Sequence, residues 1–161
     1  MPSVRLKNKK HVIPLTLLQF SDFGTHLLIE AEVNRVKNCY FVVDTGASSS
    51  VVDSNIKSLK IIKPDNDISS FALSEGSMET AFCIIKKFKA GDVVFKDYYM
   101  ACMDLSALQK MYKKVSKDKV IGLLGGDFLS INKAVIDYKN CIMTVEPEYN
   151  MPSAIVRSLF D

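Results

Sequence analysis

Apolar and polar residues alternate along much of the chain, and this pattern predicts β-strands. Between residues 25 and 33, Leu27, Ile29, Ala31 and Val33 alternate with more polar positions, so one strand face lies in a core and the other is largely wet. Residues 39–43 are apolar throughout, as in a central strand buried on both faces. That run ends abruptly in a carboxylate.

The same pattern extends the prediction to most of the chain. Turn residues at 74–77, 90–92 and 139–140 separate apolar runs and indicate hairpins, while 54–59 has the spacing of one helical turn. We expect strands at residues 12–20, 25–33, 39–43, 51–52, 68–73, 79–88, 93–103, 134–138 and 141–145.

Two helices complete the predicted fold. Ser106 and Gln109 have the spacing of a capping box, and apolar residues keep helical spacing to about residue 117. A shorter helix follows Gly125, with Asp127 interpreted as a residue of its first turn, where helix ends favour acids. The pattern predicts an all-β fold with one longer and one short helix. It has no linker or repeat, so we expect a single domain over 1–161.

Composition narrows the class of protein. The chain has 161 residues, 48% hydrophobic, enough for one core, and its net charge of +3 is too small to indicate a nucleic acid partner. No apolar run approaches the roughly 20 residues that span a membrane, so we expect no membrane partner. We interpret the cysteines as reduced, which favours a reducing compartment, and therefore expect a cytoplasmic protein. The four cysteines have no Cys-x-x-Cys spacing and are interpreted as reduced core residues; we predict no metal and no cofactor. His11 and His26 are interpreted as polar surface positions.

The candidate chemistry lies in Asp44-Thr45-Gly46, directly after the buried strand. Gly46 lets backbone pass closely, Thr45 supplies a hydroxyl that can brace the loop, and Asp44 presents the acid. Asp53 and Asp137 are interpreted as structural acids. The glycines match neither nucleotide-binding pattern, so nucleotide binding is not predicted.

Residues 41–48, Phe-Val-Val-Asp-Thr-Gly-Ala-Ser, resemble the catalytic loop of the retropepsin-like aspartic proteases. That family has a second motif, two hydrophobic residues and a glycine before a short helix, and Leu123-Leu124-Gly125 matches it. Ile121-Gly122 is a competing placement. The resemblance extends from about Leu15 to Val145 and implies a retropepsin-like acid protease barrel.

The resemblance also implies an activity. Peptide hydrolysis by this route needs two carboxylates that share one proton, and the chain has one Asp-Thr-Gly, so the implied enzyme is a homodimeric aspartic endopeptidase with Asp44 from each chain. Thr45 and Gly46 complete the catalytic loop, and Ala47 and Ser48 are expected to contact a peptide substrate. Gly76 is either the tip of a flap or part of an unrelated surface hairpin. The tail, 146–161, either contacts the partner or packs on its own subunit.

Two alternatives stay open from the sequence. The first is a non-catalytic retropepsin-fold module for peptide binding or dimerisation, which keeps the loop for structural reasons. The second is an adaptor that binds nucleic acid through the lysines of 110–119, although a solvated helix face explains them more simply.

Overall fold

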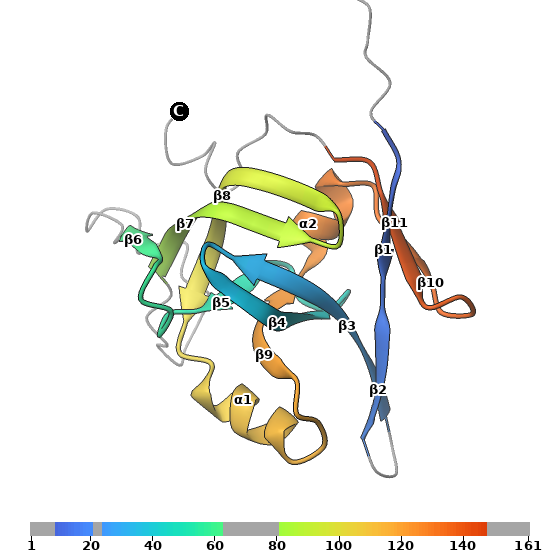
Figure 1. The fold of residues 1–161 in the computed structure, drawn as a ribbon, viewed down its shortest axis with the longest axis horizontal. Helices are drawn as coiled ribbons and strands as arrows, with labels where there is room; N and C mark the ends of the chain where they lie inside the picture. The colour runs from blue at the N-terminus through green and yellow to red at the C-terminus, as the bar shows by residue number, and fades with distance from the viewer. Residues whose placement is uncertain (1–8, 21–23, 63–80, 148–161) are drawn as a thin grey trace, which may run out of the picture.

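The computed structural model describes residues 9–20, 24–62 and 81–147, which form eleven strands and two helices (Figure 1). The elements are β1 (His11–Pro14), β2 (Thr16–Phe20), β3 (Gly24–Val33), β4 (Val36–Val43), β5 (Val51–Asp53), β6 (Lys60–Ile62), β7 (Ala81–Ala90), β8 (Val93–Met103), α1 (Ser106–Lys113), β9 (Lys119–Leu124), α2 (Gly126–Ile131), β10 (Val135–Asp137) and β11 (Ile142–Val145).

Six of these strands close into a barrel in the order β3-β4-β9-β5-β8-β7, because β7 pairs back onto β3. The closure depends on the ten-residue length of β3, which pairs with β4 from Leu27 onward and with β7 through Ala31, Glu32 and Val33. β2 and β6 extend the sheet beyond this ring. The prediction of an all-β barrel with one longer and one short helix is confirmed.

Aromatic side chains fill the barrel. Phe41 and Phe88 are fully buried, and their ring centroids lie 5.3 Å apart. Phe128 of α2 is also fully buried and lies 5.6 Å from Phe95 and 6.1 Å from Phe88. Burial of such rings contributes strongly to stability, so Phe128 anchors the short helix α2 to the core.

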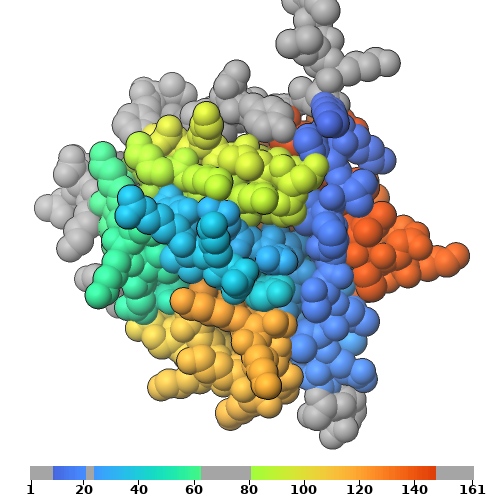
Figure 2. All heavy atoms as spheres, viewed as in Figure 1, coloured from blue at the N-terminus to red at the C-terminus, as the bar shows by residue number. Residues whose placement is uncertain are grey.

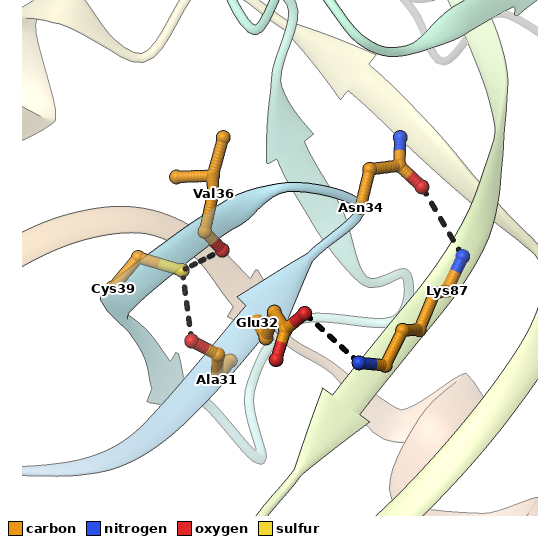
Figure 3. A network of polar contacts seen from close by, with 6 residues as sticks. All are labelled: Ala31, Glu32, Asn34, Val36, Cys39 and Lys87. Atoms are coloured by element: carbon orange, nitrogen blue, oxygen red, sulfur yellow. Dashed lines mark hydrogen bonds and ion pairs between the residues drawn. The ribbon is translucent and has the colours of Figure 1, made fainter.

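The β3–β4 hairpin is fastened to β7 by polar contacts (Figure 3). Asn34 adopts a left-handed turn conformation, φ +55°, and its side-chain oxygen accepts a hydrogen bond from the backbone N–H of Lys87 at 3.1 Å. The Lys87 ammonium lies 2.9 Å from the Glu32 carboxylate. Cys39 donates from its thiol to the Ala31 carbonyl at 3.0 Å.

All four cysteines are free, as predicted, and only Cys141 is not fully buried.

A second sheet, β1-β11-β10, brings together the first and last described strands, which Figure 2 shows side by side along one flank. Ile13 and Met143 face inward and are fully buried, whereas Val12 and Val135 face solvent on the other side. The predicted single strand 12–20 is therefore wrong in one respect. The chain changes sheets at Leu15, between β1 and β2.

Three further local predictions need correction. Residues 54–59 form consecutive turns rather than a helical turn, although Ile56 and Leu59 still pack against the core. The longer helix ends at Lys113, not near residue 117. Ser106 is its first residue rather than its cap, and the Ser106 N–H and hydroxyl both donate to Asp104. The expected strand 68–73 and turn 74–77 lie outside the described residues.

Neither helix of the described part is long and apolar enough to cross a membrane.

Candidate active site

Strand β4 ends at Val43 and places Asp44 at the edge of the barrel. The Asp44 N–H donates to the Leu124 carbonyl at 3.0 Å, so the parallel pairing of β4 with β9 fixes the start of the loop. One carboxylate oxygen, Oδ1, accepts from the N–H groups of Gly46 at 2.9 Å and Ala47 at 3.3 Å. Within the described residues no hydrogen bond reaches the other oxygen, Oδ2. The loop thus holds the carboxylate by one oxygen only.

The loop is accessible from outside. Asp44 is half-buried, whereas Thr45, Gly46 and Ser48 are exposed. A side chain at position 46 would place its Cβ 3.3 Å from Asp44 Oδ1, tighter than an ordinary contact. Gly46 therefore permits the turn that brings its own N–H onto the carboxylate.

The second motif lies directly against this loop. The N–H of Gly126 donates to the Ala47 carbonyl at 2.7 Å, and the N–H of Asp127 donates to the Ser48 carbonyl at 3.1 Å. A Cβ on Gly125 would lie 2.7 Å from the Ser49 carbonyl carbon and 2.8 Å from the Ala47 carbonyl oxygen. No side chain fits at Gly125 unless the loop backbone moves.

The competing placement at Gly122 has a different environment. A Cβ at that position would meet the Phe41 ring at 2.2 Å and the Val51 carbonyl at 2.5 Å, both inside the barrel wall. Leu123 and Leu124, in contrast, pair with Val42 and Val43, the last residues before the loop. The structure therefore brings Leu123-Leu124-Gly125, and not Ile121-Gly122, to the Asp44 loop.

Ser50 and Asp127 form a hydrogen-bonded pair that the sequence did not predict. Asp127 Oδ1 accepts from the Ser50 N–H at 2.8 Å, from the Ser50 hydroxyl at 2.6 Å and from the Phe128 N–H at 2.7 Å. The Ser50 oxygen in turn accepts from the Gly125 N–H at 2.9 Å, and Ser50 is only 1% exposed. Asp127 lies in the first turn of α2, as predicted, and also ties the end of the loop to that helix.

The other acids that the sequence analysis interpreted as structural are bonded within turns and helix contacts. Asp53 is buried and accepts from the Asn55 backbone and side chain and from the Gln109 amide at 2.7 Å, which fastens α1 to β5. Asp137 accepts from the backbone and side chain of Asn140, and these bonds lower its pKa.

His26 does not occupy the polar surface position that was predicted. It is half-buried, and its Nδ1 lies 2.5 Å from the Tyr112 hydroxyl. The Phe20 ring packs on both, with centroids at 4.7 Å from His26 and 5.3 Å from Tyr112. Burial, and then the nearby Asp44 carboxylate, raise the pKa of Tyr112 to about 12. His11 is also partly buried and contacts Asp92 at 3.3 Å.

Gly76, the candidate flap residue, and most of the tail 146–161 lie outside the described residues. In the described ranges, no group of three or more His, Cys, Asp or Glu side chains is arranged to hold a metal ion.

A barrel that displays Asp-Thr-Gly on a tight loop, with a glycine of a second motif packed beneath it, is the arrangement expected of an aspartic protease. The family model described as aspartyl protease matches residues 29–128, which include both motifs. The chain belongs to this family, and the resemblance seen in the sequence is confirmed.

Among solved structures, the chain is similar to a retropepsin-like aspartic protease from Rickettsia conorii, at 19% sequence identity and a TM-score of 0.42. The match covers 85% of this chain and 90% of that chain. No curated protein sequence matches this one.

Proposed function

We propose that this protein is an aspartic endopeptidase whose active site forms between two copies of the chain, each contributing Asp44. The observation that carries the proposal is the hydrogen bonding of Asp44: Gly46 and Ala47 hold Oδ1, and no described residue occupies Oδ2. An acid held in this way keeps one oxygen for a water molecule or for a shared proton.

The chemistry explains why two chains are needed. One carboxylate acts as a base on the attacking water while the other, protonated, polarises or protonates the scissile carbonyl. A single Asp cannot do both, and the sequence has one Asp-Thr-Gly. A two-fold dimer supplies the second carboxylate without a second motif. The exposure of Thr45 and Gly46 is consistent with the approach of a partner loop.

The remaining roles follow from this arrangement. Thr45 braces the paired loops across the axis, and Gly46 lets the two carboxylates approach. Ala47 and Ser48 contact an extended peptide that adds main-chain hydrogen bonds to the strand edges. Gly76 as a flap residue and the tail 146–161 as a dimer contact stay predictions from the sequence, because these segments lie almost wholly outside the described residues.

The test is a peptide-library cleavage assay on the wild type and on Asp44→Asn. Asparagine keeps the oxygen that accepts from Gly46 and Ala47 but cannot act as a base, so we expect folded, dimeric protein without cleavage. Asp97→Asn is the matched control, because Asp97 is exposed in β8 and has a positive φ that Asn tolerates well. Cleavage by Asp44→Asn at the wild-type rate would contradict the proposal. A wild type that binds peptides and leaves them intact would favour the non-catalytic module.

A further inference from the structure

A cavity lies at the end of the barrel where β4 and β9 begin. Its volume is about 460 Å³, which is within the range of small-molecule sites. Its lining comes from the β3–β4 turn, the start of β4, residues 53–58, helix α1 and β9. Because three cationic side chains contribute to the lining, Arg35, Lys57 and Lys119, we call it the basic cavity.

The strand directions separate the basic cavity from the Asp44 loop. β4 and β9 run parallel, and Val36 and Lys119 are their first residues, whereas Asp44 and Gly125 follow their last ones. A strand rises about 3.3 Å per residue, so along β9 Lys119 lies about 20 Å from Gly125 and Ile121 about 13 Å from it. A small ligand in the basic cavity therefore does not cover the Asp44 loop.

The three cations come from three separate segments of the chain. Arg35 lies in the turn before β4, Lys57 in the turns that follow β5, and Lys119 at the start of β9. All three are exposed, and no ion pair joins any of them to a carboxylate of the described residues. Like charges around one cavity repel each other, and a bound anion relieves that repulsion.

The acid in the lining, Asp53, is already satisfied by neutral donors. It is buried, its Oδ1 accepts from the Asn55 amide at 3.0 Å, and its Oδ2 accepts from the Gln109 amide at 2.7 Å. Three cations and one carboxylate leave the lining with a surplus of two positive charges. Asp118, which precedes β9, is not part of the lining and accepts from the Ser116 hydroxyl at 2.7 Å. A ligand with two negative charges balances the surplus.

Part of the lining is apolar. Ile121 is fully buried, and Val36 and Ile56 are partly buried and pack against the core. An inorganic anion alone would leave most of this volume and the apolar wall unused. Ligand sites of this size combine apolar walls with a few polar or charged groups that orient the ligand. The lining is therefore suited to an organic molecule with a charged group at one end.

We propose that the basic cavity binds a small organic dianion, in the simplest case a phosphate monoester. The charged group lies between Arg35, Lys57 and Lys119, and the carbon part lies against the apolar side chains. A guanidinium can hold a phosphate by two hydrogen bonds, and an ammonium contributes a compact charge. The site is separate from Asp44, and its existence does not depend on the proposed function.

The first experiment compares three probes that share a phenyl ring: phenyl phosphate, benzoate and benzyl alcohol. At pH 8 they carry two, one and no negative charges. Each is titrated into the full chain and followed by backbone NMR. We expect phenyl phosphate to produce saturable shifts around Ile56 and Ile121, with a dissociation constant at least about threefold lower than that of benzoate. Added salt should weaken its binding.

Three results would overturn the inference. The first is the absence of saturable shifts with phenyl phosphate up to about 10 mM. The second is equal affinity for benzoate or benzyl alcohol, since the two charges would then contribute nothing. The third is a set of shifts centred on the Asp44 loop instead of on the basic cavity.

The second experiment removes single cations. Arg35→Gln and Lys119→Gln should each raise the dissociation constant of phenyl phosphate by about threefold to fivefold. Lys37→Gln is the matched control, because Lys37 is exposed on β4 close to Arg35 but does not line the cavity. All three positions are exposed, so Tm should stay unchanged; Lys57→Gln, outside the strands, replaces any variant that is destabilised.

The pattern among the variants decides the outcome. An increase in Arg35→Gln and Lys119→Gln, but not in Lys37→Gln, supports the basic cavity as the site. Equal increases in all three would indicate a general effect of net charge and overturn the inference, as would no increase in any of them. Peptide cleavage does not enter these measurements, so a failure of the proposed function leaves their result unchanged.

Discussion

Gly125→Ala tests whether the second motif shapes the Asp44 loop. The added Cβ would lie 2.7 Å from the Ser49 carbonyl carbon and 2.8 Å from the carbonyl oxygens of Ala47 and Ser49. All three atoms belong to the backbone, so no side-chain rotation relieves the contact. Gly125 has φ −96° and ψ −171°, which alanine adopts freely, so the expected effect is steric.

The magnitude follows from the distances. Ordinary contact begins near 3.4 Å, so the loop must move by about 0.7 Å to accept the methyl group. Overpacking of this kind costs about 2–3 kcal/mol, which corresponds to a decrease in Tm of roughly 5–10 °C for a chain of this size. A displacement near 1 Å at a catalytic group reduces the rate by up to about 10²-fold.

Thermal unfolding and peptide cleavage of Gly125→Ala measure the two effects. Gly126→Ala is the matched control, because its Cβ would lie 3.5 Å from the Ala47 oxygen, an ordinary contact, and alanine favours the helix that begins there. We expect Gly126→Ala to keep its stability and activity. If Gly125→Ala has the same Tm and cleavage rate as Gly126→Ala, the loop does not depend on the absence of a side chain at position 125.

Three further predictions concern single side chains in other parts of the structure. Asp127→Ala leaves the buried Ser50 hydroxyl and N–H without their acceptor, so chemical denaturation should show a decrease in the free energy of unfolding of about 2–4 kcal/mol. A decrease below about 1 kcal/mol would refute the stabilising role of this hydrogen-bonded pair. The lowered pKa of Asp137 means that its carboxylate stabilises the fold above about pH 4, the ordinary value, and that this stabilisation disappears as pH falls through the lowered value. Asp137→Asn should therefore destabilise the fold more at pH 7 than at pH 2, and equal effects at both pH values would count against this reasoning. Burial raises the pKa of Cys39 to about 11, so native protein should react with thiol reagents at the half-buried Cys141 first, and early labelling of Cys39 would disprove its burial.

Local patterns were sufficient to predict most strands and the place of Asp44. Residues 39–43 are apolar throughout because β4 lies inside the barrel wall, and that continuity made the following carboxylate conspicuous. The helix end was not predictable in this way. Val115 continues the apolar spacing, but the chain leaves the helix at Lys114 because it must turn to enter β9.

Features that depend on distant segments could not be predicted. Alternation placed Leu28 on a wet strand face, whereas it is fully buried because Tyr112 and the rest of its cluster cover that face. His26 was expected on the surface, but the contact with Tyr112 leaves it half-buried. Ser50 is one of three consecutive serines, and nothing local distinguishes the one that bonds to Asp127 across 77 positions.

The central claim is that two chains share one active site, and subunit mixing measures this directly. A fixed amount of wild-type protein is equilibrated with increasing Asp44→Asn protein, and peptide cleavage is recorded at each ratio. Random pairing into two-fold dimers reduces the activity to about half at equal amounts and further as the variant increases. Cleavage that stays constant at every ratio, with subunit exchange verified, would mean that each chain acts alone.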